Sequence, residues 1–132
     1  MSKAYLGPDG RPRVRGEWRG PRGVINSAKE FVIDSGANRT GLVSSNVIGH
    51  GLVLDGIISI GTAGRPYTVL ELSGGELSFQ ASDRTGKPAM VTYRGTIIAP
   101  LSQNCLGMDA LKSVGVKLTL DLVSGSVSLE KS

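Results

Sequence analysis

Aromatic residues are scarce in this chain of 132 residues, where they make up 5%, whereas glycine occurs 19 times. That balance disfavours long helices and favours many short strands joined by tight turns. The length fits one domain and is too short for an enzyme with two lobes and a cleft between them. The composition therefore predicts a small all-β domain.

Cysteine and histidine occur once each, as Cys105 and His50. A single cysteine excludes an intrachain disulfide, and one cysteine with one histidine falls short of the ligand set of a structural zinc ion. The sequence therefore does not predict a structural metal site.

Long apolar runs are also missing from the chain. No segment approaches the length needed to cross a bilayer, and the N-terminus lacks the apolar core of a secretory signal. These absences predict a soluble chain without a membrane segment. We expect it in the cytoplasm, either alone or as the soluble part of a larger or processed protein.

The net charge of +4 is concentrated at the N-terminus. Residues 1–23 hold six Lys and Arg against Asp9 and Glu17, a net +4, which leaves nine positive and nine negative residues in 24–132. We therefore divide the chain into a basic leader rich in Gly, Pro and Arg, residues 1–23, and a domain of residues 24–132. The leader is predicted to be a flexible arm, or one short strand around Arg13 to Trp18.

Nucleic acid is the partner class that a basic leader first suggests, with Trp18 stacking on a base. No second basic patch supports that partner, so we do not expect nucleic-acid binding. A small β-barrel that binds nucleic acid would also lack its usual aromatic stacking surface here.

Short apolar segments separated by turn residues run through the rest of the chain. The stretch 28–33 predicts a buried strand that ends in a tight loop at Asp34. The same reasoning predicts strands at 52–54, 57–60, 67–72, 76–80, 90–93 and 96–99, with a turn at 55–56 and a hairpin loop at 73–75. Residues 108–114 predict one helix that stops at Gly115, and the alternating residues 116–122 and 127–129 predict a terminal hairpin.

Asp34 stands out because its carboxylate directly follows the buried strand, where few solvating side chains are available. On its own, Asp-Ser-Gly is an ordinary turn sequence. The surrounding run reads Phe31, Val32, Ile33, Asp34, Ser35, Gly36, Ala37, followed by Thr40. A second motif reads Ile97, Ile98, Ala99 and then Leu106, Gly107, Met108, Asp109, Ala110, Leu111.

These two motifs, in this order, resemble those of the retropepsin-like aspartic proteases. The first matches the pattern of apolar residues, Asp, Thr or Ser, Gly, Ala, and the second matches the apolar strand, Leu-Gly and short helix. The similarity covers about residues 24–130. It implies an all-β fold, a closed or folded β-barrel of the retropepsin type with one short C-terminal helix, that works as a homodimer.

The resemblance implies an aspartic endopeptidase whose catalytic residue is Asp34. Two chains related by a two-fold axis would bring two copies of Asp34 together, and carboxylates that close share one proton. One polarises a water for attack on a peptide carbonyl while the other donates a hydrogen bond to the carbonyl oxygen. No metal or cofactor takes part, and the partners are a second copy of the chain and a peptide or protein substrate.

The resemblance makes Ser35, Gly36 and Ala37 an active-site loop that locks the dimer. Ser35 would bond the backbone of the second copy, and Gly36 lets the substrate approach. Ala37 stands where pepsin-like relatives carry a hydroxyl that bonds the charged carboxylate, and a carboxylate without that donor is harder to ionise. We therefore expect activity at a less acidic pH than that of pepsin.

The resemblance also indicates the substrate-binding residues, which are Asn38, the flap-tip residues Gly61, Thr62, Ala63 and Gly64, and the strand residues Ile97 and Ile98. Relative to the retroviral pattern, Asn38 replaces an acid and Met108 replaces the arginine that pairs with it, so both members of one ion pair are absent. The alternative function is a catalytically inactive domain of the same fold that dimerises or binds peptides.

Overall fold

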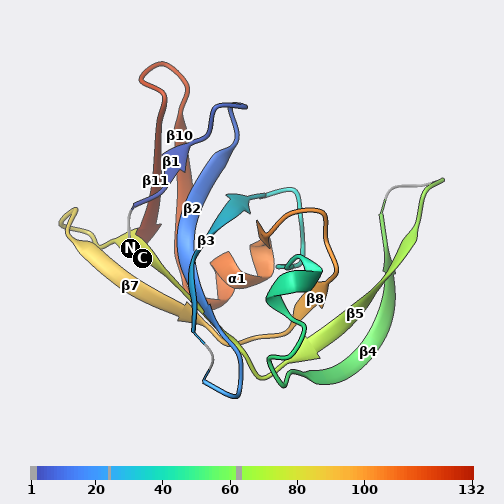
Figure 1. The fold of residues 1–132 in the computed structure, drawn as a ribbon. Helices are drawn as coiled ribbons and strands as arrows, with labels where there is room; N and C mark the ends of the chain where they lie inside the picture. Colours follow the sequence, from blue (N-terminus) through green and yellow to red (C-terminus); the bar gives the residue numbers. More distant parts are fainter. Residues whose placement is uncertain (1–2, 24, 62–63) are drawn as a thin grey trace.

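A computed structural model describes residues 3–23, 25–61 and 64–132 and consists mainly of strands (Figure 1). Over those residues the expected all-β fold and its single short helix, α1 (Met108–Ser113), are confirmed. In the same part of the chain, no helix has the length and apolar character that spanning a bilayer requires. Thr62 and Ala63, two of the predicted flap residues, lie outside the described residues.

Eight of the described strands form the larger sheet, which curls into a half-barrel (Figure 1). Its main path runs β10–β11–β6–β2–β3–β9, with β1 added to β2 and β7 added to β6. The bounds are β1 (Tyr5–Leu6), β2 (Pro12–Arg19), β3 (Ile25–Ile33), β6 (Glu76–Ser82), β7 (Pro88–Tyr93), β9 (Cys105–Leu106), β10 (Val116–Asp121) and β11 (Ser126–Lys131). β2 lies at the centre of this sheet, because it pairs with both β3 and β6.

A smaller sheet has the order β4–β5–β8, with the bounds β4 (Val53–Ile60), β5 (Tyr67–Ser73) and β8 (Ile97–Ala99), and the turn η1 (Ser44–Asn46) precedes it in the chain. β4 and β5 form a long hairpin that stands away from α1 (Figure 1). Gly41 connects the two sheets, since it bridges Ile98 of β8 and Cys105 of β9. A Cβ on Gly41 would lie 2.9 Å from the Ile98 carbonyl oxygen, so a side chain at this junction would push the backbone of β8 away.

The core lies between the curled sheet and α1. Alternate residues of the two central strands are buried, as a sheet with one covered face requires; they are Val14, Gly16 and Trp18 on β2 and Leu77, Phe79 and Ala81 on β6. Ala110 and Leu111 bury the inner side of α1 against them. The indole of Trp18 is 1% exposed and donates a hydrogen bond to the Asn46 carbonyl at 2.8 Å.

β4 is one strand, whereas the sequence predicted two short strands around a turn at Asp55 and Gly56. Its register against β5 shifts between Leu54 and Gly56, which marks a β-bulge. The turn prediction was wrong because a glycine between two apolar runs marks a bulge inside a strand as well as a turn between strands.

Residues 73–75 are not a hairpin loop, because β5 and β6 belong to different sheets. Gly74 has a φ of 103°, and a Cβ on Gly75 would lie 2.2 Å from the ring of Trp18. The two glycines therefore let the chain pass closely over the indole from the smaller sheet to the larger one. The predicted α1 and the terminal hairpin of β10 and β11 are confirmed.

The strand interpretation of the leader is confirmed, since β2 lies inside the larger sheet. Arg13 of β2 forms ion pairs with Asp9 at 2.8 Å and with Glu30 of β3 at 2.5 Å. Trp18 is buried, so its indole is not available to stack on a nucleic-acid base. Strands on the two sides of the predicted boundary at residue 23, β2 and β3, pair with each other in the same sheet.

Trp18→Ala is expected to lower the free energy of unfolding by about 3 to 5 kcal/mol, because it empties part of the core and removes the bond to Asn46. The matched control is Glu17→Ala, the exposed neighbour on the same strand, which should change that free energy by less than about 0.5 kcal/mol. Urea unfolding followed by circular dichroism gives both values. Equal effects would contradict the central position of β2.

Candidate active site

Asp34 directly follows the last residue of β3 and is half-buried. β3 runs parallel to β9, and the Asp34 N–H donates to the Leu106 carbonyl at 3.0 Å. The chain then turns, because the Asp34 carbonyl accepts from the Ala37 N–H at 3.1 Å and its Oδ1 accepts from the Gly36 N–H at 3.0 Å. The carboxylate is therefore held in a tight loop at the end of a buried strand, which is the local structure that the sequence predicts.

A cavity of about 460 Å³ opens beside Asp34. Residues that the sequence singled out contribute to its walls: Asp34, Gly36, Ala37, Asn38, Gly61 and Ile98. They come from the loop after β3, from the end of β4 and from β8, so three separate segments converge on one space. Among the described residues that line the cavity, Asp34 is the only carboxylate.

The other lining residues were not predicted from the sequence, and they are Arg39, Ile60, Tyr67, Leu101, Ser102, Gln103 and Cys105. Ile60 and Tyr67 lie opposite each other in the β4–β5 hairpin. Once Gly61 is assigned to the cavity wall, the register of that hairpin predicts that Ile60 and Tyr67 lie beside it. Residues 101–103 belong to the loop between β8 and β9, and no signal in the sequence marks where that loop lies.

Three of the predicted site residues lie outside this cavity. Ile97 is 1% exposed and packs in the core, because neighbouring strand residues point to opposite faces and Ile98 takes the cavity side. Ser35 is exposed and lines a second hollow, formed with residues of α1 and β10. Gly64 is exposed and is not part of the cavity wall that the described residues form.

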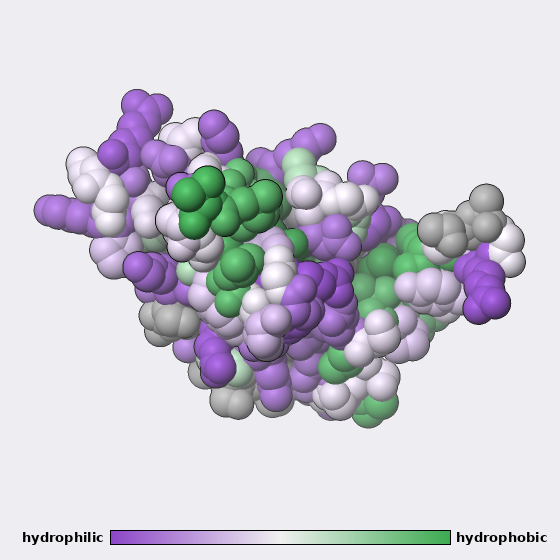
Figure 2. Space-filling model, turned by 90° about the horizontal axis from the view of Figure 1, so that it is seen from above, coloured by the Kyte–Doolittle hydropathy of each residue, from purple (hydrophilic) through white to green (hydrophobic). Residues whose placement is uncertain are grey.

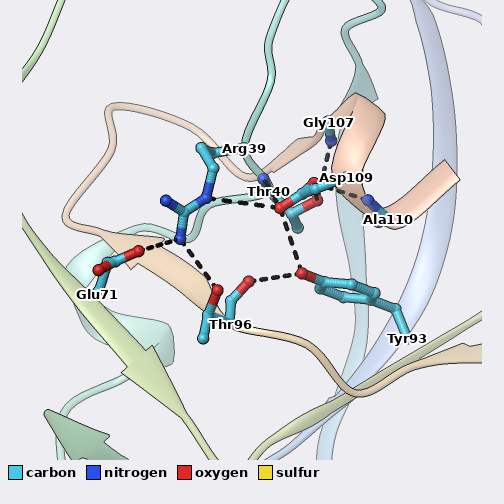
Figure 3. Close-up of polar contacts among 8 residues, drawn as sticks. All are labelled: Arg39, Thr40, Glu71, Tyr93, Thr96, Gly107, Asp109 and Ala110. Carbon is cyan, nitrogen blue, oxygen red and sulfur yellow. Dashed lines mark hydrogen bonds and ion pairs between the residues drawn. The ribbon is translucent and has the colours of Figure 1, made fainter. Parts of the chain in front are cut away.

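A polar network ties the cavity wall to three other segments (Figure 3). Arg39 forms an ion pair with Glu71 of β5 at 2.7 Å and donates a hydrogen bond to Thr96 Oγ1 at 3.0 Å. Its Nε also lies 3.8 Å from the carboxylate of Asp109 on α1. The three charged side chains are only 22 to 28% exposed, so salt screens these pairs less than it screens surface pairs.

Asp109 is the central acceptor of this network (Figure 3). Its Oδ1 accepts from the Thr40 hydroxyl and from the Ala110 N–H, each at 2.7 Å. Its Oδ2 accepts from the Thr40 N–H at 3.1 Å and from the Tyr93 hydroxyl at 3.2 Å. Thr40 Oγ1 in turn accepts from the Gly107 N–H at 3.0 Å. Thr40 therefore fastens the loop that follows β3 to the start of α1.

Cys105 also lines the cavity, although its side chain is buried. Burial, with a smaller contribution from the charge of Asp34, raises the pKa of the Cys105 thiol to about 11. The thiol therefore stays protonated at neutral pH, and a protonated thiol is a poor nucleophile. Cys105 is therefore a poor candidate for a nucleophile in this cavity.

Comparison of the chain with models of known protein families and with curated proteins finds no match. The residues of the cavity therefore carry the functional assignment. They combine one carboxylate with side-chain amides and apolar walls, a composition that suits a site for binding an extended chain and activating water.

Thr40→Val keeps the shape of the buried Thr40 side chain and removes its hydroxyl. The Gly107 N–H then loses its acceptor, and Asp109 Oδ1 loses one of its donors. We expect the free energy of unfolding to fall by about 2 kcal/mol. Urea unfolding measures it, with Thr68→Val at an exposed position of β5 as the matched control. A Thr40→Val variant as stable as the control would contradict the role of this hydroxyl.

Tyr93 predicts a pH effect, because burial and the adjacent Asp109 charge raise its pKa from 10.0 to about 12. Folding disfavours the phenolate, so the stabilisation from protonated Tyr93 is fully present below pH 10.0 and is lost as the pH rises to about 12. Subtracting the ultraviolet titration of Tyr93→Phe from that of the unaltered chain should isolate an ionisation near the upper value. An ionisation midpoint of Tyr93 at pH 10.0 would contradict its burial beside the Asp109 carboxylate.

Proposed function

We propose that this chain is an aspartic endopeptidase of the retropepsin type that acts as a homodimer. Each copy would supply one catalytic carboxylate, Asp34. The observation that carries the proposal is that Asp34 is the only carboxylate on the described walls of a cavity of about 460 Å³ and sits in the Asp-Ser-Gly-Ala loop of the motif.

The chemistry needs two carboxylates, because one group must accept a proton from water while another supplies a proton to the substrate. Two Asp34 side chains facing each other would share a single proton, since both cannot ionise at close range. The ionised member takes a proton from the attacking water, and the protonated member bonds the peptide carbonyl oxygen. When the C–N bond breaks, the proton that the first carboxylate took goes to the leaving amine.

The walls of the cavity support a peptide substrate. Ile60, Tyr67 and Ile98 offer apolar surface for side chains, while the amides of Asn38 and Gln103 can donate to or accept from a peptide backbone. The β4–β5 hairpin would act as the flap, since it brings both Ile60 and Tyr67 to the cavity and could exclude water when substrate is bound.

Arg39 supports this arrangement because it joins the proposed flap to the catalytic loop. Its ion pair with Glu71 reaches β5, and its own backbone follows Asn38 on the cavity wall. The base of the hairpin is thereby held at a fixed position relative to Asp34, while the tip of the hairpin has no such tie in the described residues.

A domain that binds peptides without cutting them is the alternative, because the same walls would serve it. Asp34 separates the two functions. An aspartic protease cannot work without this half-buried carboxylate, whereas a domain that only binds peptides does not require it.

Asp34→Asn is expected to reduce peptide cleavage by at least about 100-fold, because an amide cannot accept a proton from water. The Asn side-chain oxygen can still accept from the Gly36 N–H, so the fold should survive. Cleavage is followed by mass spectrometry of a peptide library and of the protein itself, incubated between about pH 3 and pH 7.

Glu17→Gln, the same chemical change at an exposed position of β2, is the control and should cleave like the unaltered chain. Equal cleavage by Asp34→Asn and the unaltered chain would eliminate the proposed mechanism. Peptide binding without cleavage in the unaltered chain over the whole pH range would favour the alternative function.

A further inference from the structure

Arg39 carries the only positive charge among the described residues that line the Asp34 cavity. Its guanidinium is held from three other segments, because Nη2 contacts Glu71 and the Thr96 hydroxyl and Nε lies 3.8 Å from the Asp109 carboxylate. The remaining nitrogen, Nη1, donates none of the hydrogen bonds formed among the described residues. The cavity wall therefore carries a cation that is fixed in place and still has a donor to offer.

Glu71 lies beside this guanidinium and has an acceptor of its own. Its Oε2 lies 2.7 Å from Arg39 Nη2, whereas its Oε1 accepts none of the hydrogen bonds formed among the described residues. Alternate residues of a strand share a face, so Glu71 lies on the same face of β5 as Tyr67, which lines the cavity. Figure 3 shows the side chains of Arg39 and Glu71 pointing toward each other. The pair thus presents one unused donor and one unused acceptor at the cavity wall.

Gly56 of β4 leaves the second oxygen of Glu71 uncovered. It lies directly opposite Glu71 in the β4–β5 hairpin, next to the β-bulge. A Cβ at this position would lie 3.2 Å from Glu71 Oε1, so a side chain there would crowd that oxygen. The side chains of Arg39 and Glu71 are 28% and 27% exposed, and neither Nη1 nor Oε1 is a polar atom that is buried without a partner. Both atoms are therefore open to a ligand.

Apolar walls surround this polar pair. Ile60, Tyr67 and Ile98 line the same cavity, and Figure 2 shows apolar surface between the β4–β5 hairpin, at the right of the view, and the rest of the molecule. Successive side chains of an extended peptide point to opposite sides of its backbone, so one of them can reach the pair while others contact the apolar walls. A polar pair in such a cavity selects the ligand group that satisfies it, because leaving its atoms without partners weakens binding.

We propose that Arg39 and Glu71 form a specificity site that binds a side-chain amide, from glutamine or asparagine, of the peptide substrate. This step rests on the proposed function, since it names the peptides that the Asp34 site would take. A primary amide fits because its carbonyl oxygen accepts from Arg39 Nη1 while its NH2 group donates to Glu71 Oε1. One uncharged group then satisfies both unused atoms of the pair.

A charged side chain fits the pair less well than an amide does. A carboxylate would bind Arg39 but would come close to Glu71 and Asp109, which already share that positive charge. An ammonium group would bind Glu71 but would meet the guanidinium of Arg39. Like charges at short range repel, and an ion also loses more hydration free energy than an amide on entering the cavity. A leucine side chain would leave both the donor and the acceptor without partners.

The experiment measures the binding of short peptides to the full chain in an Asp34→Asn background, so that no peptide is cut. The peptides consist of Ala, Val and Leu and carry Gln, Asn, Glu, Lys or Leu at one position, which is moved along the peptide. Fluorescence anisotropy gives each dissociation constant. At one position we expect Gln or Asn to bind about 10-fold more tightly than Leu, Glu or Lys, because two hydrogen bonds are gained and no charge is buried. The unaltered chain should cleave the same peptides with the same order of kcat/KM.

Two variants test whether the pair itself makes the selection. Glu71→Gln removes the closest negative charge from Arg39, so the Glu peptide should then bind more tightly than the Lys peptide. Arg39→Gln leaves the negative charges of Glu71 and Asp109 behind, so the Lys peptide should bind more tightly than the Glu peptide. A purely structural role of the pair would weaken all peptides alike. Arg94→Gln and Glu76→Gln make the same changes in an exposed ion pair outside the cavity and should keep the original order.

Equal binding of all peptides, or tightest binding of the Glu, Lys or Leu peptide, would overturn the specificity site. An amide preference that Glu71→Gln and Arg39→Gln both leave unchanged would also overturn it; if circular dichroism shows that Arg39→Gln is unfolded, Glu71→Gln alone decides. An amide preference without any cleavage by the unaltered chain would support the site and remove the proposed function. Cleavage without the preference would keep the proposed function and remove the site, and the absence of both binding and cleavage would overturn both.

Discussion

The hydrogen bonds between Thr40 and Asp109 are the interaction on which the geometry of the site depends. Thr40 belongs to the loop that carries Asp34, and Asp109 belongs to α1, so the bonds fix the loop to a helix whose inner side is packed in the core. The Thr40 hydroxyl both donates to Asp109 and accepts from Gly107, which makes it a bridge that no apolar residue of the same shape could replace. A carboxylate held only by its own turn would not keep one position relative to the rest of the sheet.

The carboxylate of Asp109 is partly buried, and many donors surround it. Thr40, Tyr93 and the Ala110 N–H supply hydrogen bonds, and Arg39 supplies the opposite charge. A buried charged group costs little stability when hydrogen bonds and an opposite charge satisfy it. Removing one of these partners destabilises the fold, because the charge is then buried without compensation. Because Arg39 also binds Glu71 on β5, the same charges that satisfy Asp109 fix the base of the β4–β5 hairpin. Stability and the positioning of the cavity wall therefore come from one network.

The sequence predicts those parts of the structure that depend on local pattern. The apolar run before Asp34, the helix before Gly115 and the alternating terminal hairpin are local signals, and all three are confirmed. The sequence does not predict which sheet a strand joins, so the loop at 73–75 was read as a hairpin although it connects two sheets. The ion pair of Arg39 with Glu71 was also missed, because the two residues are far apart in the chain and no periodicity relates them.

The junction of the two sheets brings the β4–β5 hairpin, which lines the cavity, to the loop that carries Asp34. Gly41 joins the two sheets into one path of strands, which in the described part of the chain runs from β4 to β10. β4 belongs to the hairpin that lines the cavity beside Asp34, and β10 belongs to the hairpin that lines the hollow beside Ser35. In the proposed function, a peptide substrate would occupy the space beside β4.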